Sequence, residues 1–138
     1  MNLETQAALE REVLDLFLKG DHFVLCALRA QLAQVQGIKR EMTGVGFWLD
    51  FELPASTLGV HEQFPVNADF EFGDVEASLL PDDQIIGFRL FIREGKLRSV
   101  EGYVCDDLMI PTIKRFEVGY TGEGRNMAEL ERTWSREA

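Results

Sequence analysis

Carboxylates at strand-like spacing are the residues of this 138-residue chain best placed to do chemistry. Nine acids and a single base, Arg89, lie between residues 46 and 91, so this segment carries eight of the ten net negative charges. In residues 47–53 and 69–72 the acids alternate with large apolar side chains, and alternate side chains of a strand point to opposite faces of a sheet. Burial of the apolar set therefore gathers four acids on the other face. They are Asp50, Glu52, Asp69 and Glu71.

This acidic face has three interpretations. It keeps an exposed sheet soluble and prevents it from pairing with other strands, it steers a cationic protein toward the sheet, or it holds a divalent cation. Like charges directly opposite on neighbouring strands destabilise a sheet, so the arrangement has a cost in every case. The cation is the weakest interpretation, because the chain has no compact ligand loop of alternating acids ending in Gly. We predict no metal site.

Trp48 lies on the acidic side of its strand by the same alternation. Tryptophan is enriched at binding hot spots, so Trp48 either covers part of the sheet or anchors an interface. A homodimer contact, with the acids at its rim, is one form of such an interface. The predicted protein-binding residues are Trp48, Asp50, Glu52, Asp69 and Glu71.

A competing interpretation is a small-ligand-binding protein or a hydrolase-like enzyme, with a pocket between predicted helices and the sheet. Histidine titrates near neutrality, and carboxylate pairs serve as general acid and base when their separation is fixed. No spacing in the chain fixes such a pair, and it has no G-x-S-x-G or H-E-x-x-H motif. We therefore predict no catalytic residue and no cofactor, and favour a protein that is not an enzyme. The residues of this alternative pocket are His61, Glu101, Tyr103 and Asp106.

The helices and strands that must position these residues follow from the spacing of the apolar side chains, and this spacing changes after Gly37. Before it, apolar residues at spacings of three and four predict two helices. We expect Thr5 to cap the first helix and Asp21 the second, with Gly20 in a left-handed turn between them. Cys26 flanks the second apolar stripe and is expected to pack as a small buried residue.

After Gly37 the alternating pattern predicts five or six strands, beginning at Phe47, with Gly44 and Gly46 forming a bend before it. The fold class is therefore α+β, with an N-terminal helical hairpin packed on one face of a mostly antiparallel sheet. Residues 1–121 form this single domain. Residues 122–138 form a tail that is either loose or a short docked helix capped by Asn126.

Composition limits the classes of partner. A formal net charge of −10 disfavours nucleic acid and anionic membranes, whose phosphates require Lys and Arg. No apolar run approaches the roughly 20 residues that span a bilayer, and the N-terminus has no basic region typical of a signal peptide. Cys26 and Cys105 have no metal-binding spacing and indicate reduced thiols in the cytoplasm. We expect a cytoplasmic protein that binds a basic protein or forms a homodimer.

Two motifs carry a resemblance to known sequences. Residues 40–47, R-E-M-T-G-V-G-F, resemble a motif in small uncharacterised bacterial proteins of similar length, and residues 94–103, E-G-K-L-R-S-V-E-G-Y, resemble their second motif. The second motif is also similar to segments of immunity proteins that neutralise bacterial toxins. The resemblance covers about residues 11–120 and transfers no catalytic residue. It implies that an immunity-like role toward a basic toxin is one form of the predicted protein binding.

Overall fold

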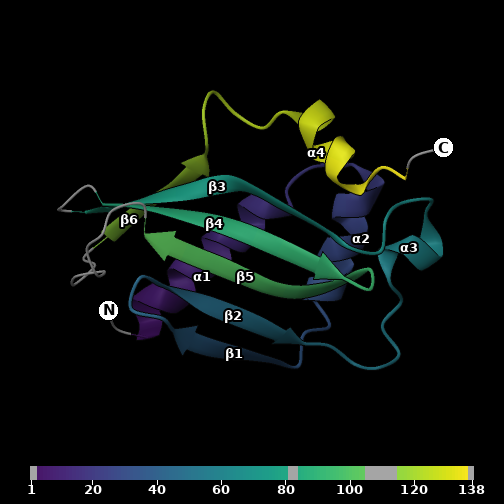
Figure 1. Ribbon diagram of the computed structural model, residues 1–138. Coiled ribbons are helices and arrows are strands. Elements are labelled where there is room, and N and C mark those ends of the chain that lie inside the picture. The colour runs from purple at the N-terminus through teal and green to yellow at the C-terminus, as the bar shows by residue number, and fades with distance from the viewer. Residues whose placement is uncertain (1–2, 81–83, 105–114, 137–138) are drawn as a thin grey trace.

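The computed structural model describes residues 3–80, 84–104 and 115–136. These residues form four helices and one six-stranded sheet (Figure 1). In chain order the elements are α1 (Leu3–Phe17), α2 (Phe23–Leu32), β1 (Gly37–Met42), β2 (Gly46–Glu52), α3 (Val60–Gln63), β3 (Phe70–Leu80), β4 (Gln84–Arg93), β5 (Lys96–Val104), β6 (Arg115–Tyr120) and α4 (Met127–Trp134).

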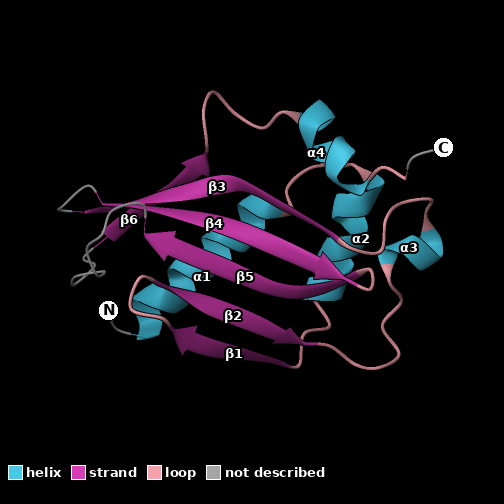
Figure 2. Ribbon diagram, in the orientation of Figure 1, coloured by secondary structure: helices cyan, strands magenta, loops and turns pink. Residues whose placement is uncertain are grey.

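The strands lie in the order β1-β2-β5-β4-β3-β6, and every neighbouring pair is antiparallel. Strands β1 and β6 are the two edges. Helices α1 and α2 lie on one side of the sheet (Figure 2), with α1 against β3 and β6 and α2 against β5. The predicted α+β fold, with N-terminal helices on an antiparallel sheet, is confirmed.

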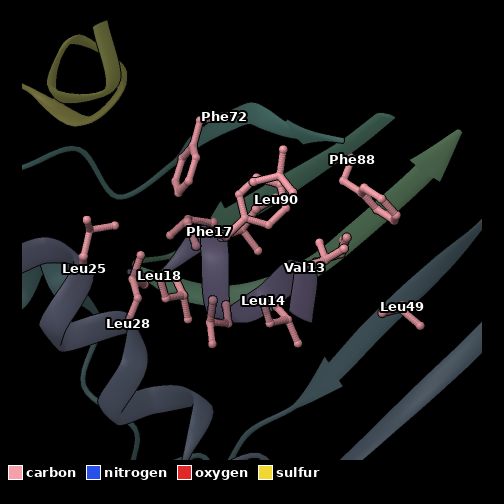
Figure 3. Close-up of a cluster of buried hydrophobic side chains, with 14 of the residues drawn as sticks. Val13, Leu14, Phe17, Leu18, Leu25, Leu28, Leu49, Phe72, Phe88 and Leu90 are labelled. Atoms are coloured by element: carbon pink, nitrogen blue, oxygen red, sulfur yellow. The ribbon is translucent and has the colours of Figure 1, made fainter. Parts of the chain in front are cut away.

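The core fills the space between the two N-terminal helices and the sheet (Figure 3). Val13 and Phe17 of α1, at helical spacing, are buried against the inward-facing side chains of the strands. The rings of Phe17 and Phe72 meet edge to face with centroids 5.6 Å apart, a favourable aromatic geometry. The alternating Phe and Leu residues of β2 point inward as predicted, so their intervening side chains point away from the helices.

Three details of the helical hairpin differ from the sequence-based expectation. Thr5 lies inside α1, which already contains Leu3, and the cap of α2 is His22 rather than Asp21. His22 has an extended backbone and its Nδ1 accepts a hydrogen bond from the Val24 N–H at 3.1 Å, so the ring satisfies an otherwise free amide. Cys26 is exposed, because α2 directs Leu25 and Leu28 toward the core and position 26 lies outside this apolar stripe.

Strand β1 is an element that the pattern analysis missed. Helix α2 ends at Leu32, and Gly37 opens β1 instead of ending the helix. The charged run Lys39-Arg40-Glu41 masks the alternation of a strand that is exposed along most of its length. Gly44, with a φ of +86°, belongs to the turn that joins β1 to β2, so the expected bend is a β-hairpin.

One buried polar side chain ties α2 to the β4–β5 turn. Gln31 Nε2 donates to the carbonyl oxygens of Leu58 and Gly95 at 3.1 and 2.9 Å. Its Oε1 accepts from the Leu97 N–H at 2.9 Å. Because every polar group of this side chain has a partner, burying it holds the turn in one position relative to the helix.

The C-terminal segment contains the docked helix α4. Asn126 Oδ1 accepts from the Glu129 N–H at 3.1 Å and caps it, as the sequence predicts. Leu130 and Trp134 are buried, and the Trp134 ring lies edge to face against Phe70 and Phe72 at centroid distances of 5.7 and 6.1 Å. Helix α4 therefore extends the core beyond β3.

Candidate functional site

The candidate site is the sheet face that points away from α1 and α2, here called the open face. No described helix covers this face (Figure 2). The strand register assigns side chains to it, because residues paired across neighbouring strands share a face. Trp48 of β2 pairs with Glu101 of β5, which pairs with Arg89 of β4. Tyr103 of β5 and Phe91 of β4 lie on the same face, each two residues from a member of that row.

Aromatic side chains form the centre of the open face. The rings of Trp48 and Phe91 lie 5.4 Å apart and are tilted by 40°. Tyr103 is 37% exposed and its ring lies over Gly87, where a Cβ atom would come within 2.5 Å of the ring. Glycine at position 87 therefore allows the ring to lie flat on β4. The result is a half-buried aromatic surface facing solvent.

Two glutamates flank Trp48 in the register. Glu41 of β1 lies opposite it on one side and Glu101 of β5 on the other. Asp50 and Glu52 continue the same face of β2 toward the end of the strand. These four carboxylates form no ion pair with another described residue, although Lys39 lies opposite Asp50. Trp48 is thus bordered by negative charge that is available to a partner.

Glu71 behaves differently from these four acids. Its two oxygens lie 2.7 Å from Arg93 and 3.3 Å from Arg89. The hydrogen bond from Arg93 is the main reason that the pKa of Glu71 lies below its usual value, and burial opposes this shift. Arg93 also places its guanidinium 5.3 Å from the Phe91 ring centroid. Glu71 is therefore neutralised within the fold.

The open face contains more bases than the single Arg89 of residues 46–91 indicates. The count of one base refers to a segment of sequence, whereas antiparallel pairing brings in bases from outside that segment. Arg93 reaches Glu71, and Lys39 lies beside Asp50. The open face consequently carries mixed charge.

The five predicted binding residues are divided between two places. Trp48, Asp50 and Glu52 share the open face, and Glu71 lies there as an ion-paired residue. Asp69 lies in the bend before β3, where its Oδ1 accepts from the Glu94 N–H at 2.9 Å, so it is outside the sheet.

Sequence reasoning missed Glu41 and Phe91. Glu41 was missed because β1 was not recognised. Phe91 could have been found, since the pattern that directs Leu90 and Ile92 inward directs Phe91 to the other face.

The alternative pocket is not assembled by the described residues. His61 lies in α3 and packs against Gly59 and the β4–β5 turn at Gly95. Glu101 and Tyr103 belong to the open face, on the other side of the sheet from the helices. Asp106 lies outside the described residues.

Three surface hollows in the described part of the chain lie elsewhere. One of about 310 Å³ lies between β3 and α4 and is lined by Asp74 and Glu129, among others. Hollows of about 290 and 280 Å³ border α2, the first beside Trp134 and the second beside Gln31. None of the three is lined by His61, Glu101 or Tyr103.

In residues 3–80, 84–104 and 115–136, no three His, Cys, Asp or Glu side chains are grouped so as to hold a metal ion. No helix in these ranges combines the length and apolar character needed to cross a membrane.

Comparison with protein-family models, with curated proteins and with solved structures gave no match to this chain. No residue role is therefore transferred from another protein. The interpretation of the open face depends on its own geometry and charge.

Proposed function

We propose that this protein is a protein-binding module, not an enzyme, whose open face recognises a cationic segment of a partner protein. The observation that carries the proposal is the row Glu41–Trp48–Glu101, in which an aromatic ring lies between two carboxylates that have no ion pair within the described chain.

The chemistry of this row fits an arginine or lysine side chain. A cation over the face of a tryptophan ring gains about 0.5–2 kcal/mol, depending on how far it is desolvated. Carboxylates on both sides accept charge-assisted hydrogen bonds from the same cation, and arginine can donate two such bonds at once. Asp50 and Glu52, exposed beside the row, add the long-range attraction that speeds association.

The aromatic centre favours binding over solubility alone as the role of this face. Acids that only keep a sheet in solution do not need Trp48 and Phe91 in contact at its centre, 5.4 Å apart. Aromatic anchors surrounded by charged residues are the usual composition of a binding hot spot. Neutralisation of a basic toxin by an immunity-like protein is one form that this function takes.

The two tryptophans of the chain allow a direct test. Trp48 lies on the open face, whereas Trp134 is 2% exposed in the core, so its indole N–H resonance is an internal reference. In an NMR titration with a short arginine-rich peptide, we expect the Trp48 resonance to shift and the Trp134 resonance to stay in place. A glutamate-rich peptide of equal length should move neither resonance.

Matched variants separate this site from general electrostatic attraction. The E41Q/E101Q variant should weaken peptide binding roughly tenfold, since it removes both flanking charges. The E12Q/E123Q variant removes the same number of exposed charges elsewhere and should bind almost as the parent does. Equal losses in the two variants, or equal shifts of both tryptophans, would contradict the proposal.

A further inference from the structure

The outer edge of β1 has no strand paired with it in the described chain. Only β2 pairs with β1 in the described chain, and Figure 1 shows β1 at the lower border of the sheet with no element beyond it. Residues 38–42 are all exposed. Such an edge presents unpaired backbone N–H and C=O groups that another strand can bind.

One hydrogen bond identifies which backbone groups of β1 face β2 and which face outward. The Thr43 N–H donates to the Gly46 carbonyl at 3.0 Å, and bonded pairs alternate along an antiparallel ladder. The β1–β2 bonds therefore involve Glu41, Lys39 and Gly37, which leaves the N–H and C=O of Ile38, Arg40 and Met42 directed outward.

The β2–β5 ladder agrees with this assignment. The Val104 N–H donates to the Val45 carbonyl at 2.8 Å, so the odd-numbered residues of β2 are bonded to β5. The even-numbered residues of β2 are then available to β1. Both ladders therefore indicate that the outward-directed backbone groups of β1 belong to its even-numbered residues.

We infer that two copies of this chain associate through β1, antiparallel to each other, with Arg40 at the two-fold axis. In this register the three outward-directed residues of each copy meet outward-directed residues of the other, as a ladder requires. Lys39 lies opposite the partner's Glu41, and symmetry repeats that pair. Ile38 lies opposite the partner's Met42.

Charge selects this register over its neighbours. Sliding the strands to the adjacent registers of the same parity places Lys39 opposite the partner's Lys39, or Glu41 opposite the partner's Glu41. Like charges directly opposite destabilise a strand pair, whereas opposite charges stabilise it. Of these three alignments, only this one places Lys39 opposite the partner's Glu41.

The remaining side chains of β1 also fit this alignment. Arg40 would meet the partner's Arg40, but its guanidinium is already held by Glu10 of α1 at 2.7 and 2.9 Å. Ile38 and Met42 are 37% and 58% exposed and lie on the helix side of the sheet, where pairing covers them. In this alignment Ile38 and Met42 would bury apolar surface, and Lys39 and Glu41 would pair opposite charges. The two Arg40 side chains would each remain paired with their own Glu10.

This association goes beyond the proposed function and does not depend on it. Pairing through β1 joins the two sheets edge to edge and leaves both open faces uncovered. Trp48 and the partner's Trp48 would lie on the same side of the joined sheet, separated by the β1 strands. In the dimer Glu41 of each row would pair with Lys39 of the other copy, so each row would keep Trp48 and Glu101 for a binding partner.

Sedimentation over a range of protein concentrations, without any peptide, tests the inference. The parent chain should show a monomer–dimer equilibrium. K39E and E41K should each raise the dissociation constant on the order of tenfold, because each replaces two attractive pairs with two repulsive ones. K19E and E12K make the same charge changes at exposed positions away from β1 and should dimerise as the parent does.

Mixing the two variants gives the decisive result. The K39E chain presents two acids on β1 and the E41K chain two bases, so a mixed dimer has opposite charges at both positions. Equimolar K39E and E41K should therefore dimerise about as tightly as the parent, and so should the K39E/E41K double variant. A monomeric parent, or mixtures no tighter than the single variants, would overturn the inference.

A backbone variant tests the ladder independently of charge. M42P removes an N–H that points to the free edge, so the thermal unfolding midpoint should change little while dimerisation is lost. Unchanged dimerisation of a folded M42P chain would also overturn the inference.

Discussion

The two edge strands of the sheet differ in how firmly they are attached to the rest of the protein. Strand β6 is tied down: the Tyr120 hydroxyl donates to the Leu16 carbonyl of α1 at 2.6 Å, and Arg125 lies 4.7 Å from the Tyr120 ring centroid while pairing with Asp74. Strand β1 is exposed along nearly its whole length, and among the described residues its one ion pair with α1 is Arg40–Glu10. Strand β6 is therefore held more firmly against the rest of the protein than β1 is.

This difference shows how a small sheet protein can control where it associates. A free edge invites pairing with any extended chain unless it is covered or charged. At β6 the protein packs α1 against the strand. At β1 it uses the alternating charges of Lys39 and Glu41, which exclude most partners and match few. Glu41, Asp50 and Glu52 of the open face lie on this same side of the sheet.

The largest expected effect separates the two tryptophans. W134A removes a ring buried against Phe70 and Phe72 and should lower the free energy of unfolding by about 3–5 kcal/mol. W48A removes a half-exposed ring and should lower it by only about 1 kcal/mol. Urea denaturation measures both values. Equal losses would mean that Trp48 serves the core as much as Trp134 does.

The next effect concerns the ion pair between β1 and α1. R40M leaves the Glu10 carboxylate, 4% exposed, without its partner and should cost about 2 kcal/mol of unfolding free energy. K39M, on the exposed neighbour, should change stability by less than about 0.5 kcal/mol. The E10Q/R40M variant should recover part of the loss, because no buried charge remains. If R40M and K39M are equally mild, the Arg40–Glu10 pair does not hold β1.

A smaller effect is expected at strand β6. Y120F removes the hydrogen bond to Leu16 and should cost about 1 kcal/mol. Burial raises the pKa of Tyr120 above its ordinary value, so its contribution is complete below pH ~10 and is lost as the pH rises through the folded-state pKa. Chemical denaturation between neutral and high pH should therefore show a flatter decline in Y120F than in the parent. An identical decline would contradict this role.

The smallest effect tests the ion pairs of the open face. The lowered pKa of Glu71 means that its stabilisation is present above pH ~4.5 and is lost as the pH falls through the folded-state value. Because the side chain is 37% exposed and screened by solvent, E71Q should cost only about 0.5 kcal/mol at neutral pH. The difference between E71Q and the parent should vanish in acid. A difference that persists there must have a cause other than charge.

Elements with a clear period could be predicted from sequence, and contacts between distant segments could not. The stripe of Met127, Leu130 and Trp134 predicts α4 because a 3.6-residue period needs no knowledge of its partner. The inward Phe residues of β2 follow from alternation in the same way. Strand β1 was not predicted, because it is an exposed edge strand in which only Ile38 and Met42 are large apolar residues. Hydrophobic periodicity therefore gives little indication of a strand there.

In the candidate site, too, local periodicity predicts some residues and contacts between distant segments determine the others. Trp48, Asp50 and Glu52 follow from the alternation within one strand. The neutralisation of Glu71 depends on Arg93, 22 residues away, and the flanking of Trp48 depends on strands β1 and β5. Strand order decides both, and the local pattern contains no information on strand order.

The central claim is that the outer edge of β1 is free in the single chain and patterned for association with a second copy. Amide hydrogen exchange followed by NMR at low and high protein concentration tests it residue by residue. At low concentration the amides of Ile38, Arg40 and Met42 should exchange rapidly while those of Lys39 and Glu41 are protected, and at high concentration all five should be protected. Rapid exchange of Ile38, Arg40 and Met42 at both concentrations, or protection of these three at both, would contradict the account.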